Sequence, residues 1–294
     1  MLAEFGMVRL SEVKRLACPT CQGSLTFQGS ERAGELYEGR LECGKCKPWP
    51  VEEGLCRLYR EEAVRGNDRL LRYFYDGLPS LHDAAVRYTL PVFQAGTEQQ
   101  VRDGYMPRLE LAALKPRPDG QPVRILEVGI GTGANLAWVR RDLPPGLPVE
   151  IWGVDLSQGM LNVLRQRLPQ WGQSGPCLLM ADAHALPFPA ASFDRVFHTG
   201  AIGNYRAPAV ALAEMARVAI PGTPIVVVDE QLDSSRRQGL YHRLMFRLVT
   251  FYDRHPHAPV EHLPAGAVDV RVEQISRFFY CLSFRMPEGP GVAR

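Results

Sequence analysis

Three glycines on alternate positions, Gly129, Gly131 and Gly133, follow the carboxylate of Glu127 near the middle of this 294-residue chain. A short apolar run precedes Glu127, and a helical pattern begins at Leu136. Glycines allow a tight turn from strand to helix and let the backbone lie against a ligand. An acid two residues before the first glycine suits a ligand with an ammonium group better than the phosphates bound by a G-x-G-x-x-G turn. A glycine-rich turn without a ligand is the alternative.

Two more acidic residues follow predicted strands further along the chain. Asp155 comes after a strand at 149–154, 22 positions after the last glycine, and Asp182 comes after a strand at 177–181. A carboxylate at the position of Asp155 can accept hydrogen bonds from both ribose hydroxyls of a nucleotide. We therefore expect the ends of three neighbouring strands to carry Glu127, Asp155 and Asp182 toward one ligand.

The elements that position these acids alternate between strand and helix. Ser157 is expected to cap a helix that Pro169 ends, and 208–218 is expected to form another helix. The remaining strands are expected as short apolar runs at 192–198, 225–229, 268–272 and 278–284.

These motifs, in this order, resemble those of class I S-adenosylmethionine (SAM) methyltransferases over roughly residues 120 to 230. The resemblance implies that Glu127 meets the amino group of the methionine moiety, that Asp155 binds the ribose, and that Asp182 binds the adenine amino group. The other residues implied to contact SAM are Tyr75, Gly129, Gly131, Gly133, Leu156, Met160, Ala183 and His198.

The resemblance is closest to the methyltransferases of ubiquinone and menaquinone biosynthesis, on the segments 153–160 and 182–188. That broad group includes enzymes that act on unrelated small molecules. It implies an α/β, Rossmann-like sheet of seven strands in the order 3-2-1-4-5-7-6, with strand 7 antiparallel. We assign this sheet to residues 119–294.

Four cysteines near the N-terminus form two C-x-x-C pairs, Cys18 with Cys21 and Cys43 with Cys46. Four thiolates at this spacing match a structural tetrahedral zinc site, with iron as a minor competitor. A pair of disulfides is the alternative. The first ten residues hold no long apolar run that would indicate secretion, so we expect a cytoplasmic, reducing location that favours metal.

The run Trp49-Pro-Val-Glu-Glu-Gly-Leu-Cys56 follows the second cysteine pair. It resembles a run in the small zinc-ribbon proteins that activate tRNA, rRNA and protein methyltransferases, although Cys56 stands where that pattern has proline. We assign residues 1–60 to a β-rich zinc ribbon. Cys56, Cys177 and Cys281 are interpreted as apolar core residues.

Residues 61–118 are interpreted as a helical lid followed by a linker, with helices at 68–75 and 81–89. Related methyltransferases carry Tyr-Asp pairs that close over the cofactor, and Tyr75-Asp76 fits the first such pair. At the position of the second Tyr-Asp pair, the sequence is Leu81-His82-Asp83, with histidine in place of tyrosine. Aromatic packing of these helices onto the sheet is an equally favoured reading.

Candidates for acceptor chemistry are expected where the fourth and fifth strands of the sheet end. They are His198, Asn204, Tyr205, Asp229 and Glu230. His198 is the best candidate for a general base, because imidazole titrates near neutral pH. A wall contact with adenosine is the alternative role of His198, and Tyr205 is either an aromatic wall or a donor to the acceptor.

A helical stretch at 235–252 carries Leu240, Leu244, Leu248 and Tyr252 along one face and four arginines on another. A wall for an apolar or anionic acceptor and a partner-binding helix are two readings. The favoured reading is an ordinary connecting helix with a solvated charged face.

The composition of the chain favours one of three possible functions over the other two. The 46% apolar content suffices for a core, no apolar run reaches the length of a membrane span, and the net charge is only +2. A net charge this small provides little electrostatic attraction for nucleic acid. Methylation of a small apolar or aromatic molecule is therefore favoured over methylation of an RNA base. A SAM-binding scaffold without catalysis is the third hypothesis, and the ribbon could contact a protein partner or a second copy of the chain.

Overall fold

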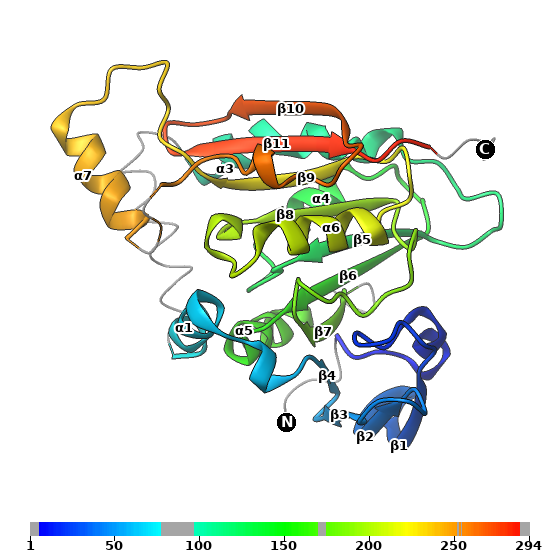
Figure 1. Cartoon of the computed structure of the whole chain (residues 1–294). Helices are drawn as coiled ribbons and strands as arrows, with labels where there is room; N and C mark the ends of the chain where they lie inside the picture. Colours follow the sequence, from blue (N-terminus) through cyan, green and yellow to red (C-terminus); the bar gives the residue numbers. More distant parts are fainter. Residues whose placement is uncertain (1–5, 78–96, 170–174, 252, 254, 289–294) are drawn as a thin grey trace.

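One mixed sheet of eleven strands organises the chain in the computed structural model, which describes residues 6–77, 97–169, 175–251, 253 and 255–288 (Figure 1). The strand order is β1-β2-β3-β4-β7-β6-β5-β8-β9-β11-β10. The N-terminal strands are β1 (Thr26–Arg32), β2 (Glu35–Glu42), β3 (Trp49–Glu52) and β4 (Leu55–Leu58). The others are β5 (Val123–Val128), β6 (Val149–Asp155), β7 (Cys177–Ala181), β8 (Arg195–Thr199), β9 (Ile225–Glu230), β10 (Val268–Gln274) and β11 (Phe279–Arg285).

The last seven of these strands have the topology expected from the sequence. Counted from β5, their order is 3-2-1-4-5-7-6, and the final strand β11 is antiparallel to β9 and β10. Strands β5 to β9 are parallel to one another, and their apolar runs are buried on both faces, as central parallel strands require. The predicted seven-stranded α/β sheet is therefore confirmed.

Helices cover the two faces of this sheet. The α-helices are α1 (Gly66–Gly77), α3 (Glu98–Tyr105), α4 (Leu136–Asp142), α5 (Gln158–Arg167), α6 (Pro208–Val218) and α7 (Leu240–Val249). Short 3-10 turns are η1 (Leu10–Arg15), η2 (Glu61–Ala63), η3 (Met106–Leu109), η4 (Leu111–Ala113), η6 (Ile202–Asn204) and η7 (Val260–His262). Side chains alternate along β5, so Leu126 packs in one core with α6 while Ile125 packs in the other with α4 and α5.

The N-terminal ribbon continues the methyltransferase-like sheet instead of standing apart from it. Strand β4 pairs in parallel with β7, which places Cys56 opposite Leu179 and Leu58 opposite Ala181. Buried ribbon side chains such as Trp49 belong to the same apolar core as Trp152 of β6. The three segments expected from the sequence, 1–60, 61–118 and 119–294, thus include two that share one sheet. Each helix that the structure describes is too short or too polar to traverse a bilayer.

The shared core predicts that damage inside the ribbon destabilises the whole chain. Leu58→Ala removes a side chain with no exposed surface and should cost about 2–5 kcal/mol of the free energy of unfolding. Urea unfolding followed by far-UV circular dichroism measures this loss. The matched control, Val268→Ala at a side chain 43% exposed, should change it by about 0.5 kcal/mol or less. Two separate transitions, with only the first moved by Leu58→Ala, would contradict a shared core.

Candidate active site and metal centre

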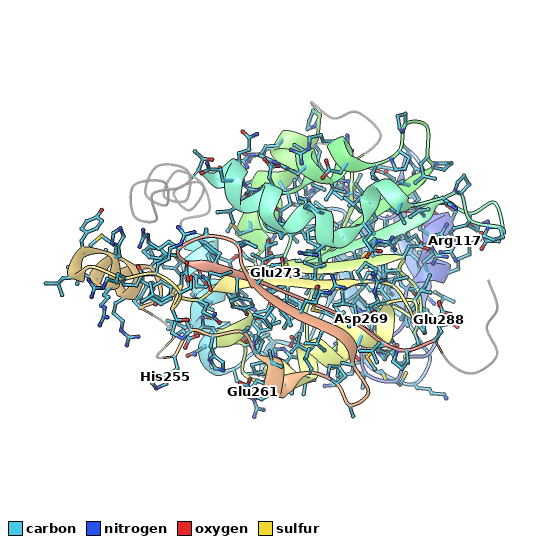
Figure 2. All side chains as sticks on the ribbon, turned by 90° about the horizontal axis from the view of Figure 1, so that it is seen from above. Arg117, His255, Glu261, Asp269, Glu273 and Glu288 are labelled. Carbon is cyan, nitrogen blue, oxygen red and sulfur yellow. The ribbon has the colours of Figure 1, made fainter. Side chains whose placement is uncertain are left out.

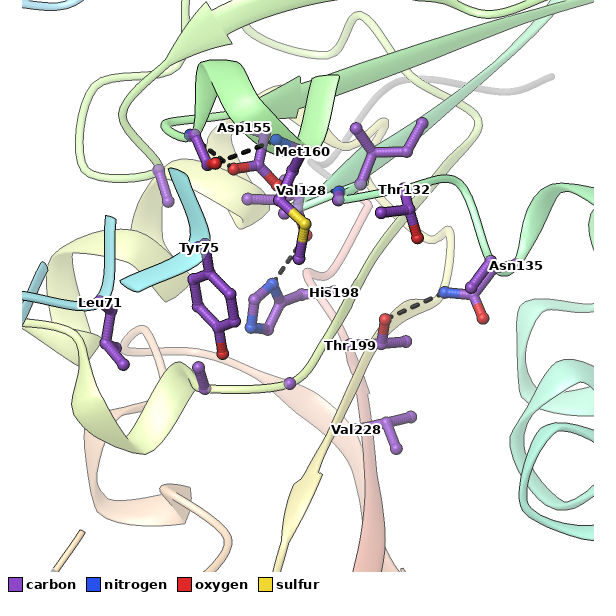
Figure 3. Close-up of a pocket in the computed structure, with 18 of the residues that line it drawn as sticks. Leu71, Tyr75, Val128, Thr132, Asn135, Asp155, Met160, His198, Thr199 and Val228 are labelled. Atoms are coloured by element: carbon purple, nitrogen blue, oxygen red, sulfur yellow. Dashed lines mark hydrogen bonds between the residues drawn. The ribbon is translucent and has the colours of Figure 1, made fainter. Parts of the chain in front are cut away.

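A cavity of about 970 Å³ opens at the carboxyl ends of the five parallel strands (Figure 3). Each strand contributes a lining residue from its end: Val128, Asp155, Ala181, Thr199 and Glu230. Residues from α1, α3 and α7 complete the wall. This volume is at the upper end of the range for small-molecule sites, so it can hold a nucleoside and a second molecule together.

The glycine turn after β5 forms one side of the cavity. Gly129, Gly131 and Gly133 have φ angles of 72°, 53° and 77°, a left-handed conformation that glycine adopts without strain. A Cβ atom on Gly129 would lie 3.2 Å from the His198 ring, whereas a Cβ on Gly131 would meet nothing closer than 3.9 Å. The turn therefore presents bare backbone to the cavity at Gly131.

Asp155 holds this turn against the next strand. Its Oδ2 accepts a hydrogen bond from Gly131 N at 2.8 Å, and its Oδ1 accepts one from Ser157 N at 2.8 Å. Burial raises the pKa of Asp155, and the two backbone donors act in the opposite direction. Each carboxylate oxygen keeps a second lone pair that can accept from a ribose hydroxyl in the cavity.

The start of α5 continues the wall on this side. Ser157 caps the helix as expected, because its Oγ accepts from Met160 N at 3.1 Å. Leu156 and Met160 also line the cavity. Asp76 of α1 accepts from Ser157 Oγ at 2.7 Å and from Gly159 N at 3.0 Å, so it attaches α1 to α5. Tyr75, the other half of this pair, lines the cavity. The segment Leu81-His82-Asp83 and the helix expected at 81–89 lie outside the described residues.

Glu127 lies just behind the cavity wall, not on it. It is 1% exposed, and its Oε1 accepts from Asn135 Nδ2 at 2.5 Å. Its Oε2 has no hydrogen-bond partner among the described residues. Burial raises the pKa of Glu127 to about 8. A buried carboxyl with an unpaired oxygen fits an ammonium group that approaches from the cavity.

Asn135, which binds Glu127, is the centre of a hydrogen-bonded cluster that was not predicted from the sequence. Asn135 Oδ1 accepts from Arg102 Nε at 2.9 Å and from Tyr105 Oη at 2.6 Å, and Asn135 Nδ2 also donates to Thr199 Oγ1 at 2.9 Å. Arg102 and Tyr105 come from α3, about thirty positions before Asn135, so nothing local in the sequence indicates their convergence. The guanidinium of Arg102 can pair with a carboxylate in the cavity.

Asp182 lines the cavity together with Ala183, but its carboxylate already has partners. Oδ2 accepts from Arg206 Nη2 at 2.6 Å, and Oδ1 accepts from His184 N at 2.9 Å. Burial alone would raise the pKa of Asp182, but the hydrogen bonds from His184 and Arg206 bring it below its ordinary value. Arg206 also binds Asp68 of α1, so this network joins α1 to the site expected for adenine. A ligand amino group there has to use the remaining acceptor positions of the carboxylate.

His198 is buried at the end of β8, and burial favours the neutral form of its ring. Its Nδ1 lies 2.7 Å from the carbonyl oxygen of Val128, an acceptor only, so the ring proton is on Nδ1. Nε2 has no hydrogen-bond partner among the described residues, and burial lowers the pKa of the ring. Tyr205 lies beside it, with ring centroids 5.3 Å apart. Both residues line the cavity, which is compatible with a base and with a wall for adenosine.

The other residues predicted to act on the methyl acceptor differ in whether they line the cavity. Glu230 lines the cavity, whereas Asp229 and Asn204 do not. Both oxygens of Asp229 accept backbone hydrogen bonds, from Ala201 N at 2.8 Å and from Gly203 N at 3.0 Å. Asp229 therefore holds the loop after β8 in place, a role that its position at a strand end did not indicate.

The four N-terminal cysteines converge as their spacing predicts. The sulfur atoms of Cys18, Cys21, Cys43 and Cys46 all lie within 4.8 Å of one another, and Cys21 Sγ lies 3.7 Å from Cys43 Sγ. Zinc bound to sulfur at about 2.3 Å in a tetrahedron gives sulfur–sulfur distances of about 3.8 Å. The backbone N–H of Lys45 lowers the pKa of Cys43 to about 6, whereas hydrogen bonding with Cys21 raises that of Cys46 to about 12. All seven cysteines are free thiols, and Cys56 and Cys281 are buried.

A comparison with protein families decides what this sheet is. The family model described as a methyltransferase domain matches residues 126–227. That span includes Glu127, Asp155, Asp182 and His198, on the sheet order described above. These residues belong to a class I SAM-dependent methyltransferase domain.

The methyltransferase domain is similar to the ubiquinone/menaquinone biosynthesis C-methyltransferase UbiE of Burkholderia mallei, with 38% identity over 120 residues. The match covers 40% of this chain and 46% of that relative, so the chain spans about half the length of the curated relative. UbiE of Burkholderia thailandensis matches equally well.

Two solved structures share the fold of the methyltransferase domain. Phosphoethanolamine N-methyltransferase 2 of Haemonchus contortus, in complex with SAM, has a TM-score of 0.54 at 15% identity, covering 82% of this chain and 62% of that one. The [4+2]-cyclase SpnF has a TM-score of 0.56 at 18% identity, covering 74% and 96%. At these identities the likeness shows the fold alone.

The raised pKa of Glu127 predicts a proton signature for cofactor binding. With a pKa of about 8, about nine-tenths of Glu127 is protonated at pH 7. An ammonium group placed beside it favours the charged form, so binding of S-adenosylhomocysteine at pH 7 should release most of one proton. Affinity should rise with pH between 6 and 8. Calorimetry in two buffers of different ionisation enthalpy measures the release. Glu127→Gln should abolish it, and an unchanged release in that variant would place the ammonium elsewhere.

The thiol cluster predicts about one zinc per chain in freshly purified protein. Cys21→Ser should lose the metal, whereas the control Cys177→Ser, outside the cluster, should keep it. Because a bound metal contributes its binding energy to folding, a chelator should lower the melting temperature of the wild type and leave metal-free Cys21→Ser unchanged. Elemental analysis and thermal scans test both statements. Protein with no metal, or with iron in place of zinc, would contradict the zinc assignment.

Proposed function

We propose that the chain is an active SAM-dependent methyltransferase that acts on a small apolar or aromatic acceptor. The observation that carries this proposal is a large cavity at the strand ends that is lined by both polar and apolar side chains. The polar lining includes Asp155, Asp182 and Arg102. The apolar lining includes Leu71, Phe74, Val228, Leu248, Phe251 and Phe279.

The polar side chains of the cavity suit the separate parts of SAM. Asp155 accepts from the ribose hydroxyls, and Asp182 with Ala183 borders the adenine. Glu127, behind Asn135, attracts the ammonium group, and Arg102 pairs with the carboxylate of the methionine moiety. Tyr75, Leu156, Met160 and the backbone of Gly129 and Gly131 enclose the nucleoside, whereas Gly133 is outside the cavity lining and packs close to Leu164.

Methyl transfer needs little covalent chemistry from the protein. SAM supplies a methyl group on a cationic sulfur, which departs as a neutral thioether while the acceptor atom forms the new bond. The protein aligns the two reactants and excludes water, and this alignment accounts for much of the rate. His198 Nε2 takes the proton that the acceptor loses as it attacks, and Tyr205 orients the acceptor.

Support for a small acceptor comes from two directions. The cavity has the size and the apolar lining typical of small-molecule sites, and the net charge of the chain is only +2. The UbiE relatives are named C-methyltransferases of ubiquinone and menaquinone biosynthesis, which supports a small acceptor related to quinones. We assign the zinc ribbon a structural role, because it extends the sheet and lies outside the cavity lining.

An assay with SAM labelled in its methyl group tests the proposal. Purified protein is incubated with a panel of quinols, phenols and apolar amines, and with RNA as a competitor for label. We expect label in the organic extract and none in RNA, and Asp155→Ala should remove it while the control Asp119→Ala, in the exposed linker, keeps it. Label in RNA, or label nowhere although SAM binds, would contradict the proposal. The assay is needed because the fold alone does not establish methyl transfer: SpnF, which shares it, is named a [4+2]-cyclase.

The role of His198 has its own test. If Nε2 is the base, His198→Gln should lower kcat by about 10²-fold or more and leave the Kd of S-adenosylhomocysteine nearly unchanged. A raised Kd with an unchanged kcat would instead assign His198 to the wall of the adenosine site. The pH dependence of kcat in the wild type, lost in the variant, distinguishes a proton acceptor from a residue that only packs.

A further inference from the structure

Helix α7 carries apolar side chains on the face turned away from the protein. Leu240, Tyr241, Leu244 and Leu248 are 85%, 49%, 61% and 58% exposed, and Phe251 just after the helix is 62% exposed. Phe246 is the buried residue by which the helix packs on the core, in contact with Phe278. The sequence favoured an ordinary connecting helix with a solvated charged face. In the structure, the leucine face of α7 is exposed to solvent in addition to the charged face.

Basic residues accompany this apolar stripe. Arg236, Arg237, Arg243 and Arg247 lie in or just before the helix, and the sequence from 235 to 251 contains no aspartate or glutamate. Asp233 pairs with Arg236 at 2.9 Å, so the stretch from 233 to 251 keeps three net positive charges. Figure 1 shows α7 projecting from one end of the sheet, and Figure 2 shows its side chains extending outward from the rest of the molecule.

The stripe continues into the cavity. Leu248, Val249 and Phe251 belong to the cavity lining, so the exposed face of α7 and the interior of the site share residues. Helix α1, which also contributes to the cavity lining, is partly apolar at its surface, with Leu70 63% and Phe74 48% exposed. Phe74 lines the cavity as well. Two helices that line the cavity therefore carry exposed apolar side chains, and positive charge lies beside one of them.

We propose that α7 docks on the surface of an anionic lipid bilayer and holds the cavity entrance against it. A helix with an apolar stripe, a basic flank and no acidic residue has the composition of helices that lie in the membrane interface. The apolar side chains enter the boundary between headgroups and acyl chains, and the arginines pair with anionic headgroups. A protein groove would bury the leucines equally well, and the three net positive charges of the stretch from 233 to 251 favour an anionic surface as the partner. Docking is independent of methyl transfer; that an acceptor enters from the bilayer is a consequence that rests on the proposed function.

Vesicle flotation with the full chain tests the docking. Wild-type protein should float with vesicles of phosphatidylcholine and phosphatidylglycerol, bind weakly to phosphatidylcholine alone, and lose binding as salt increases. Leu240→Glu with Leu244→Glu, two residues outside the cavity lining, should reduce the bound fraction at least tenfold. The matched control is Val270→Glu with Val272→Glu, at apolar residues 39% and 42% exposed on β10, and it should bind like the wild type.

A second pair of variants isolates the charge. Arg237→Gln with Arg243→Gln should weaken binding to the anionic vesicles and remove most of its salt dependence, whereas Arg40→Gln with Arg271→Gln should not. All variants should bind S-adenosylhomocysteine like the wild type, which shows that they fold. Absence of flotation by the wild type, or binding unaffected by the leucine substitutions, would overturn the proposal. So would light scattering that shows a dimer which the leucine substitutions dissociate.

Discussion

The fit of a left-handed glycine turn against the carboxylate of Asp155 is the constraint on which the site depends. Gly131 can donate its N–H to Asp155 only if the chain reverses sharply after β5, and a side chain at Gly129 would press on the ring of His198. The same carboxylate accepts from Ser157 and so fixes the start of α5. One partly buried acid thereby links two strand ends, one helix and the bare backbone that faces the cavity.

Helix α1 depends on this frame as well. It reaches the site through Asp76, which binds the start of α5, and through Asp68, which binds Arg206 beside Asp182. These two attachments bring Tyr75 to the cavity. Hydrogen bonds thus hold α1 beside Asp155 and Asp182, the two carboxylates where the nucleoside is expected.

Much of the fold followed from the sequence because its signals are local. The strand ends at Glu127, Asp155 and Ala181 and the cap at Ser157 are written in consecutive residues. The cysteine cluster followed from spacing alone. The parallel pairing of β4 with β7 did not, since it joins Cys56 to Leu179 across more than a hundred residues and no short motif encodes it. The convergence of Arg102 and Tyr105 on Asn135 is equally nonlocal. The apolar stripe of α7 was evident from the spacing of its leucines in the sequence. That spacing alone did not show whether the stripe packs on the protein or faces solvent.

A crystal structure with bound S-adenosylhomocysteine would show where the nucleoside and the amino-acid part of the ligand lie. We expect the ribose hydroxyls on Asp155, the chain of the ligand along Gly131, the adenine beside Asp182 and Ala183, and the amino group toward Glu127 and Asn135. A ligand bound elsewhere, or a cavity that stays empty at saturating ligand while the turn keeps its geometry, would contradict this expectation.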